Sequence, residues 1–574
     1  MSPSPPEILA RFDERPRLAL RPGGELVGLF VRWRAGSQEI AARRSADGGR
    51  TWTEPQTLLV LPSEPGHWGG CQVVADLDGE LHAFLLNDRH TGVFPDAGGQ
   101  REAGPQVPRR IDIWHTRTAG DIQAWRGPQR IWQGYTGSLN GGLCTRAGRL
   151  VLPFARLTSR TWRERGEGLD AFWFSGTSSS LAVYSDDGGD TWQESPSELK
   201  VQSPAIGTYG AVEPVVAELE DGRLWMLIRT QLGRFYDSIS ADGARWSQPR
   251  PTHLINSDSP AGLVRVPDGR LVLLWNKCRR FPYAHGGRHV LHGAVSSDEG
   301  RTWVGHREVA RDPLRDEPPP AGGDHGTAYP YPLALPDGAV LATTGQGAGR
   351  VCIVRIDPEW LAAGESRWPG AGDDGDAWST FGCRGASLAG GAGGQARLCV
   401  ARAAAEWPAA AVWNFPLARR GALHLRLRAR APFGGALLLL ADHFSVPFDP
   451  EDAIDAVVAT QLVAAGAASA APGDGFDDGD TPGPRAMGPR WLPEAVGSLA
   501  LPAGEWCDVT VEWDLDAARV RLSGPGGPAV DLRPRRVADG LCYLRLKSTA
   551  ESADGGLELE SVRSERRPPL GEEI

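Results

Sequence analysis

An octapeptide that recurs along the first part of the chain constrains the fold more than any other feature. The full form, Ser-x-Asp-x-Gly-x-Thr-Trp, occurs as SADGGRTW (45–52), SDDGGDTW (185–192) and SSDEGRTW (296–303). A shortened copy, SADGARW (240–246), and a degraded copy, TAGDIQAW (118–125), accompany them. Ser and Asp can bond the backbone of a turn, Gly allows a positive φ, and Trp can pack under the loop. The repeat therefore predicts a series of similar hairpin turns.

A glycine turn that leads into an apolar run forms a second, independent repeat. Its six copies are PGGELVGLF (22–30), DGELHAFLL (78–86), AGRLVLPFA (147–155), DGRLWMLIR (221–229), DGRLVLLW (268–275) and DGAVLATTG (337–345). Five copies are each followed by one octapeptide, and the sixth leads into VCIVRID (351–357). Repeats of about 50–70 residues with several short strands have the size of propeller blades. The sequence thus predicts an all-β fold with a six-bladed β-propeller over residues 1–365.

Both repeats stop near residue 370, and residues 366–574 are predicted to form a second domain. A chain of 574 residues exceeds what one hydrophobic core usually serves. Strand-like runs at 422–431, 435–444, 508–515 and 541–548 predict a β-sandwich. The stretch LPAGEWCDVTVEWDLDAARVRLSG (501–524) resembles concanavalin-like jelly-roll sandwiches, in which a Trp-bearing turn precedes a long strand. We expect this domain to be an accessory one.

Composition excludes several classes of partner. The formal net charge of −10 is spread along the chain, which disfavours nucleic acid and anionic membrane surfaces. No secretory signal and no run of about 18 apolar residues is visible, so a cytoplasmic location is the default expectation. The eight cysteines include no CxxC pair, and buried free thiols are expected. No dinucleotide fingerprint, phosphate loop or metal-ligand spacing predicts a cofactor or metal, and the oligomeric state stays open.

The octapeptides resemble the Asp boxes of the sialidase (neuraminidase) superfamily, and this resemblance runs over residues 11 to about 360. Asp boxes lie away from the active site in that family, so they indicate a fold rather than a reaction. The resemblance implies a site in which three arginines hold the carboxylate of an acidic sugar. It also implies a tyrosine nucleophile, a glutamate that activates it, and an aspartate acid/base.

Four segments carry the resemblance to that site. In GAVEPVVAELEDGRLWMLIRT (210–230), Glu213 occupies the position of the activating glutamate and Arg229 that of the second arginine. In GRHVLHGAVSSDEGRTW (287–303), Arg288 occupies the position of the third arginine, and in TAYPYPLALPDG (327–338) spacing selects Tyr329 over Tyr331 as nucleophile. In ERPRLALRPGGEL (14–26), spacing favours Arg15 as the first arginine, with Arg17 as the alternative of the same strand parity.

The acid/base aspartate of the family has no counterpart in this sequence. The corresponding stretch, VRWRAGSQEIAARR (31–44), contains Glu39 as its only acid. The next segment, GHWGGCQVVADLDGELHAFLLNDRH (66–90), offers His67, Asp88 and His90 instead. Substrates with good leaving groups need little protonation, so the departure does not exclude catalysis.

Three functions are therefore open, each with a carbohydrate as partner. The first is an exo-glycosidase that hydrolyses a terminal acidic sugar, either sialic acid or a related nonulosonic or uronic acid. The second is a propeller-type polysaccharide lyase or a rhamnose- or uronate-directed hydrolase. A histidine facing Tyr329, namely His67, His285, His289 or His325, would favour the lyase. The third is a glycan-binding propeller without catalysis.

Overall fold

The computed structural model is almost entirely β-structure. It describes residues 3–89, 110–159, 176–201, 210–278, 287–315, 325–370, 376–380, 386–390, 396–403, 409–445, 455–465, 497–525 and 527–567. One α-helix, α1 (Pro358–Ala362), occurs among them. None of these residues belongs to a helix with the length and apolarity needed to cross a membrane.

The chain divides into two compact units, with the main division after Trp360. Val304–Glu308 groups with the second unit although it precedes that division. The repeats predict a single boundary after residue 365, whereas here one short segment of the fifth sheet is grouped with the second unit.

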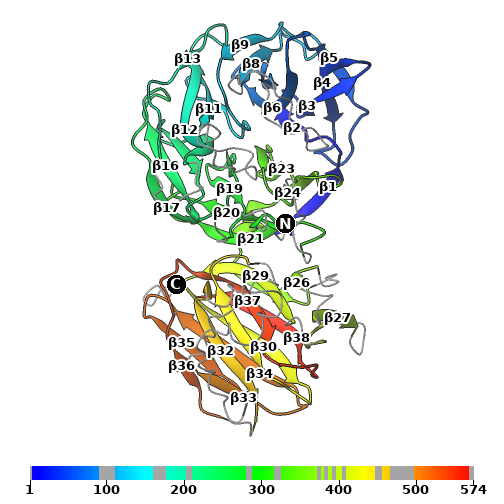
Figure 1. The fold of residues 1–574 in the computed structure, drawn as a ribbon, viewed down its shortest axis with the longest axis vertical. Helices are drawn as coiled ribbons and strands as arrows, with labels where there is room; N and C mark the ends of the chain where they lie inside the picture. The colour runs from blue at the N-terminus through cyan, green and yellow to red at the C-terminus, as the bar shows by residue number, and fades with distance from the viewer. Residues whose placement is uncertain are drawn as a thin grey trace, which may run out of the picture. The chain divides into compact units, whose positions relative to one another are not determined.

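Six four-stranded antiparallel sheets make up the first unit and follow one another around the propeller in chain order (Figure 1). The first three are β2 (Arg17–Leu20), β3 (Leu26–Arg34), β4 (Ser37–Ser45), β5 (Gln56–Val60); β6 (His67–Ala75), β7 (Leu81–Asp88), β8 (Ile111–Arg117), β9 (Gln129–Trp132); and β10 (Leu143–Cys144), β11 (Leu150–Ser159), β12 (Gly176–Ser185), β13 (Gln193–Glu194). The next three are β14 (Val212–Glu218), β15 (Leu224–Arg229), β16 (Arg234–Ser240), β17 (Arg250–Ile255); β18 (Gly262–Arg265), β19 (Leu271–Trp275), β20 (Val290–Ser296), β21 (Val304–Arg311); and β22 (Tyr331–Ala334), β23 (Val340–Thr344), β24 (Cys352–Ile356), β1 (Glu7–Arg11).

The N-terminal strand closes the propeller. β1 pairs antiparallel with β24 and so completes the sixth sheet, whose other three strands come from the end of the unit. The first strand of the first sheet, β2, contacts β22 of the sixth sheet and β6 of the second. The six predicted blades are therefore present, and the ring is closed by non-local pairing.

The glycine turns join the first and second strands of all six sheets. In each turn one backbone N–H donates to the carbonyl four residues later, as from Asp76 to Glu80 or from Leu219 to Arg223. The turn glycines have φ between 82° and 92° in Gly24, Gly79, Gly148, Gly222, Gly269 and Gly338. Such φ values are easy only for glycine, which explains why this residue recurs in the repeat.

The octapeptides connect the third and fourth strands, and their predicted bonding is confirmed. In SADGGRTW, the Gly49 N–H donates to Ser45 Oγ at 2.9 Å, and the Trp52 indole donates to the Gly49 carbonyl at 2.8 Å. The copies at 185–192 and 296–303 repeat both bonds. Hydrogen bonds from Thr51 to the Asp47 carboxylate lower the pKa of that carboxyl to about 2.

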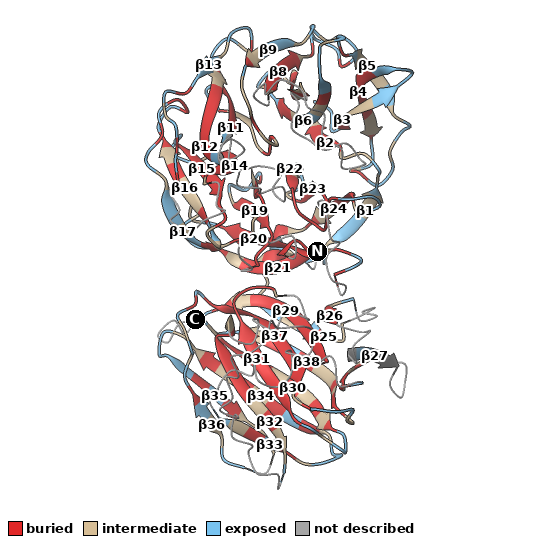
Figure 2. Ribbon diagram, in the orientation of Figure 1, coloured by how far each residue is buried: buried red, intermediate tan, exposed pale blue. Residues whose placement is uncertain are grey.

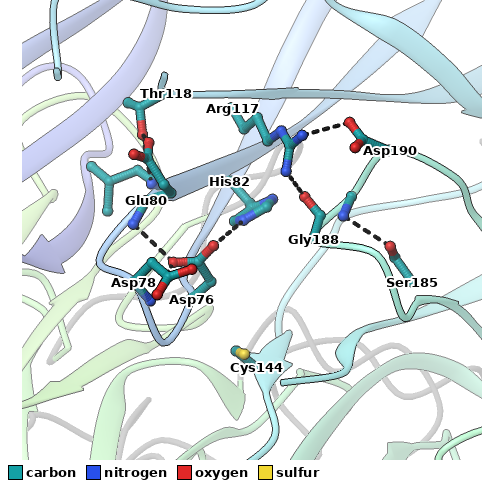
Figure 3. A network of polar contacts seen from close by, with 12 residues as sticks. Asp76, Asp78, Glu80, His82, Arg117, Thr118, Cys144, Ser185, Gly188 and Asp190 are labelled. Carbon is teal, nitrogen blue, oxygen red and sulfur yellow. Dashed lines mark hydrogen bonds and ion pairs between the residues drawn. The ribbon is translucent and has the colours of Figure 1, made fainter. Parts of the chain in front are cut away.

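A polar network ties the octapeptide at 185–192 to the neighbouring sheet (Figure 3). Arg117, at the end of β8, donates to the Gly188 carbonyl and to Asp190. Beside it, His82 on β7 contacts Asp76 at 3.2 Å and His115 on β8 at 2.9 Å. His82 and His115 are buried, so this junction between two blades contains polar groups beside its apolar side chains.

The core of the propeller lies along the second strands and between adjacent sheets. All described positions of β15, β19 and β23 are buried, as the red strands of Figure 2 show. Both faces of these strands pack against neighbouring blades, so their sequences are continuous apolar runs rather than alternating ones.

The second unit is a β-sandwich of two sheets. One contains β27 (Ala386–Gly390), β28 (Ala396–Val400), β38 (Leu557–Arg566), β30 (Arg420–Ala429), β34 (Cys507–Asp514), β35 (Arg519–Ser523) and β36 (Val530–Leu532), with β25 (Glu365–Trp368) also paired to β38. The other contains β26 (Trp378–Thr380), β29 (Ala410–Ala418), β37 (Leu541–Ser548), β31 (Ala436–Ala441), β32 (Val458–Ala464) and β33 (Ser498–Leu501). Their facing side chains form one hydrophobic core.

No disulfide joins the cysteines within the described ranges, and five of these seven are buried as predicted, namely Cys71, Cys278, Cys352, Cys507 and Cys542. Cys144 and Cys399 are half-buried, which the prediction of buried thiols did not anticipate. Cys383 lies outside the described residues.

Candidate active site

Tyr329 and Glu213 lie near the starts of the first strands of two different blades, and their side chains contact each other. Glu213 is the second residue of β14, and Tyr329 lies two residues before β22. The Tyr329 hydroxyl donates to Glu213 Oε1 at 2.8 Å, and both side chains are buried. A phenol that donates to a carboxylate is the arrangement in which the carboxylate can accept the phenolic proton.

The backbone is unusual at both residues. Glu213 has φ 46° and Tyr329 has φ 61°, in the left-handed region that side chains other than glycine rarely adopt. A register shift between Val212 and Val215 places Glu213 in a bulge of the β14–β15 pair. Such conformations cost about 1–3 kcal/mol each and concentrate at functional sites. The fold therefore holds this pair in place at an energetic cost.

Glycine allows the Tyr329 segment to approach the neighbouring blade. Gly326 has φ 84°, and a Cβ on it would lie 2.1 Å from the Arg288 carbonyl oxygen. The next residue, Thr327, donates its N–H to that carbonyl at 2.7 Å. The segments that carry Arg288 and Tyr329 are thus fixed against each other.

Arg229, the last residue of β15, contacts both members of the pair. Its Nη1 donates to Glu213 Oε2 and, at 3.2 Å, to the Tyr329 hydroxyl. Its Nε donates to Asp258 Oδ1 at 2.8 Å, and its Nη2 lies 2.7 Å from the same oxygen. Asp258 in turn accepts a hydrogen bond from Gln231 at 3.0 Å.

Arg15 and Arg288 both approach the ring of Tyr329. Their guanidinium carbons lie 5.8 Å and 5.6 Å from the ring centroid. Arg288 also donates to the Gln346 side chain and to the Asp258 carbonyl, both at 2.9 Å. The three predicted arginines and the predicted Tyr–Glu pair are therefore brought together.

The structure separates Arg15 from its alternative, Arg17. The Arg17 guanidinium is stacked on the ring of Tyr331, 3.2 Å from its centroid, and donates to the Arg15 carbonyl. Burial lowers the pKa of Arg17 from its usual value. Tyr331 is bonded through its hydroxyl to Asn140, so Arg17 and Tyr331 form a separate buried pair.

The charges of this group favour an anion. Arg15, Arg229 and Arg288 contribute three positive charges, whereas Glu213 and Asp258 contribute two negative ones. The excess of one positive charge matches a ligand with a single carboxylate. No three His, Cys, Asp or Glu side chains within the described ranges are arranged to hold a metal ion.

The candidate general acids lie in different places. Glu39, on β4, is bonded to Arg32 at 2.7 Å and to Thr57 at 2.9 Å, which are contacts within its own sheet. His67 and Asp88 are register partners at the open ends of β6 and β7. His67 also lies edge-on to Trp33, with ring centroids 6.0 Å apart. His90 lies outside the described residues.

Two of the other histidines that would favour a lyase contact each other. His289 and His325 are buried, and their rings contact each other with centroids 5.6 Å apart. His285 lies outside the described residues.

Sequence reasoning missed Asp258 and Gln231. Asp258 lies in the connection before β18, just as Arg15 precedes β2 and Tyr329 precedes β22. The shared signal is a position a few residues before the first strand of a blade.

The six-bladed fold, the Asp-box turns and this charged cluster define a propeller of the BNR-repeat class. The chain matches the family model described as "BNR repeat-like domain" over residues 24–341. The chain belongs to that family, within the sialidase-like superfamily.

One curated relative is a sialidase of Micromonospora viridifaciens, 25% identical over 337 residues. The match covers 52% of this chain and 43% of that protein, so the chain spans less than half of its length. Among solved structures, Trypanosoma rangeli sialidase matches 97% of this chain and 92% of its own at 13% identity, with a TM-score of 0.39. The NanB sialidase of Streptococcus pneumoniae matches 62% and 70% at 13% identity, with a TM-score of 0.42.

Proposed function

We propose that this protein is an exo-glycosidase that hydrolyses a terminal acidic sugar. The observation that supports this most directly is the contact of the Tyr329 hydroxyl with both Glu213 and Arg229 beside Arg15 and Arg288. The similarity to a sialidase supports the same class of reaction. The sugar is sialic acid or a related nonulosonic or uronic acid, because one carboxylate balances the charge of the site.

In the proposed reaction Tyr329 Oη attacks the anomeric carbon while its proton passes to Glu213 Oε1. The bond from the anomeric carbon to the leaving oxygen breaks, and a tyrosyl–sugar bond forms. The leaving group departs as the aryloxide. Water then adds to the anomeric carbon and gives up one proton to solvent, the tyrosyl–sugar bond breaks, and Glu213 returns its proton to Tyr329 Oη. Two displacements give retention of configuration at the anomeric carbon. Arg15, Arg229 and Arg288 provide the positive potential that attracts the sugar carboxylate.

The proposal is tested with a panel of aryl glycosides of sialic acid, deaminated sialic acid, 3-deoxy-octulosonic acid, glucuronic acid and rhamnose. We expect release from one acidic member, and a loss of about 100-fold or more in kcat for Tyr329→Phe, which lacks the nucleophile. Tyr184→Phe is the matched control, since its hydroxyl is bonded to Gln193 on the outer strands of the third sheet. It should retain full activity.

Each other outcome contradicts the proposal in a different way. Release that survives in Tyr329→Phe would exclude the tyrosine as nucleophile. Unsaturated products from uronate polymers, without release from any aryl glycoside, would indicate a lyase. Saturable binding of an acidic glycan without turnover would indicate a binding propeller.

A further inference from the structure

A cavity of about 370 Å³ lies between the fourth and fifth blades, where the glycine turn of the fourth meets the octapeptide of the fifth. Its lining includes Trp225 of β15, Asp237 and Ile239 of β16, His253 of β17, and Arg301 of the octapeptide. Cavities of this size commonly hold a small ligand. None of these residues belongs to the candidate active site.

The cavity and the candidate active site lie at opposite ends of the same strands. The cavity includes Leu219 and Arg223, which close the glycine turn between β14 and β15. Glu213 and Arg229 lie at the other ends of these two strands. At about 3.3 Å per residue, the stretch of β15 from Trp225 to Arg229 spans about 13 Å. The two sites are therefore separate.

Asp237 places an ionisable group in this cavity without an ion pair. Its Oδ2 accepts a hydrogen bond from the Trp225 indole at 3.0 Å, and its side chain forms no other hydrogen bond or ion pair with the residues that the structure describes. Burial raises the pKa of its carboxyl, a shift that Arg250 and His253 partly oppose. Half-buried carboxylates normally have several donors as partners. The second oxygen of Asp237 is thus open to a donor from a ligand.

The fold does not require an acid at this position. In the second blade His115 takes the place of Asp237, since each is the register partner of the residue five positions after the turn glycine. There His115 contacts His82, and the next octapeptide packs on both rings. The same type of junction therefore forms with two neutral rings. The carboxylate of Asp237 calls for another explanation than folding.

The rest of the lining is apolar on the inside and cationic at the edge. Leu219 and Leu254 are buried and give the cavity apolar walls. Arg301 is exposed, and its side chain has no hydrogen bond or ion pair with the described residues. Glu299, which also lines the cavity, is already paired with Arg265 at 2.7 Å. Arg301 is thus able to pair with an anionic group of a ligand.

These features specify the chemistry of the ligand. An ionised carboxylate only accepts hydrogen bonds, so Asp237 requires donors such as hydroxyl groups. The guanidinium of Arg301 disfavours a cation and suits a carboxylate. Apolar walls suit the C–H faces of a ring. We infer that this cavity binds one acidic sugar, with hydroxyl groups on Asp237 and the sugar carboxylate at Arg301. The site goes beyond the proposed function, because it binds a sugar where none is cleaved.

Calorimetric titration of the full chain with free sugars tests the inference. The Arg15→Gln variant is the parent protein, because it weakens binding at the candidate active site. The probes are sialic acid and glucuronic acid, with glucose as the neutral comparison. We expect saturable binding of at least one acid. Asp237→Asn should weaken that binding about 10-fold or more, since the amide keeps an acceptor for the indole but loses the charge. Arg301→Gln should weaken it about 3-fold or more.

Arg50→Gln is the matched control, because Arg50 has the position in the first octapeptide that Arg301 has in the copy at 296–303, and is likewise exposed. It should leave the affinity unchanged. Absence of binding by both acids, or equal affinity with and without Asp237→Asn, would overturn the inference. Equal affinity for glucose would also overturn it, since glucose offers no anion to Arg301. Failure of the proposed function would instead appear as a silent aryl glycoside panel with this binding unchanged.

Discussion

A substitution of Arg15 should change substrate binding without changing the stability of the fold. The Arg15 guanidinium lies 5.8 Å from the ring of Tyr329 and is bonded to none of the described residues. We therefore expect Arg15→Gln to raise KM for an acidic aryl glycoside by about 30-fold or more, the value of a charge-assisted hydrogen bond to a carboxylate. Thermal unfolding of this variant should match that of wild type. Steady-state kinetics and calorimetry on the same preparation measure both quantities.

Arg17→Gln is the control for that variant. Arg17 lies only two residues from Arg15 in the chain, but its guanidinium contacts Tyr331 instead of Tyr329. Its guanidinium stacks on Tyr331, so its removal should lower the melting temperature. A larger rise in KM for Arg17→Gln than for Arg15→Gln would reverse the assignment of the first arginine.

Some residues of the candidate site can be predicted from the sequence and others cannot. The difference is whether a local motif or a tertiary contact fixes the position of the residue. Glu213 and Arg229 lie at fixed distances from the glycine turn of the fourth blade, and Tyr329 lies at a fixed distance from that of the sixth blade, so local spacing predicts them. Asp258 pairs with Arg229 across 29 residues of chain, and no local pattern requires an acid there. The positive φ of Glu213 and Tyr329 likewise follows from tertiary packing rather than from their own conformational preferences.

At the scale of the elements, His82 of β7, which Figure 3 shows beside the octapeptide 185–192, lies 2.9 Å from His115 of β8. A Cβ on Gly189 would lie 2.8 Å from the His115 ring, so the octapeptide packs directly on it. Burial lowers the pKa of His115 to about 3 from an ordinary 6.5, and burial also lowers the pKa of His82. Both rings are therefore neutral in the folded protein near pH 7.

Acid should weaken this junction. Above pH 6.5 His115 is neutral in the folded and unfolded states, so its contribution does not depend on pH. As pH falls below 6.5 only the unfolded state binds the proton, and stability is lost toward the folded pKa of about 3. We expect the free energy of unfolding to fall by about 2–3 kcal/mol from this group between pH 6.5 and 4.5, measured with denaturant.

His115→Gln should remove that part of the slope, whatever its own effect on stability at pH 7. His253→Gln is the matched control, because His253 lies exposed on β17 and should leave the slope unchanged. An identical pH dependence in His115→Gln and wild type would contradict the argument.

At the scale of the whole molecule, some parts of the topology are marked by a local sequence motif and others are not. Each propeller blade carries its own glycine turn, so counting turns counts sheets. In the sandwich, the C-terminal strand β38 lies between β28 and β30, and β32 and β33 pair in parallel. Neither arrangement is marked by a repeated motif, and the sequence predicts strands there without their order.

Closure of the propeller is the same kind of non-local pairing, and it can be tested by shortening the chain. β1 pairs with β24 of the sixth sheet, while Glu7 of β1 forms an ion pair with Arg50 in the first octapeptide. Phe12, just after β1, lies edge-on to Trp52 of that octapeptide. The strand thus joins the last blade to the first.

Removal of residues 1–11 should expose the edge of β24 and lower the melting temperature of the propeller by several degrees, since about 1 kcal/mol shifts a transition of this size by about 2–4 °C. Amide exchange of Cys352–Ile356 should accelerate, because those residues lose their β1 partners. Activity on the aryl glycoside should also fall, since Arg15 lies in the short connection between β1 and β2. Removal of residues 1–4 is the control, because it keeps the whole of β1. If the longer deletion left both the melting temperature and the exchange rate unchanged, the argument would be contradicted. Contacts between adjacent blades, and not the pairing of β1 with β24, would then stabilise the closed ring.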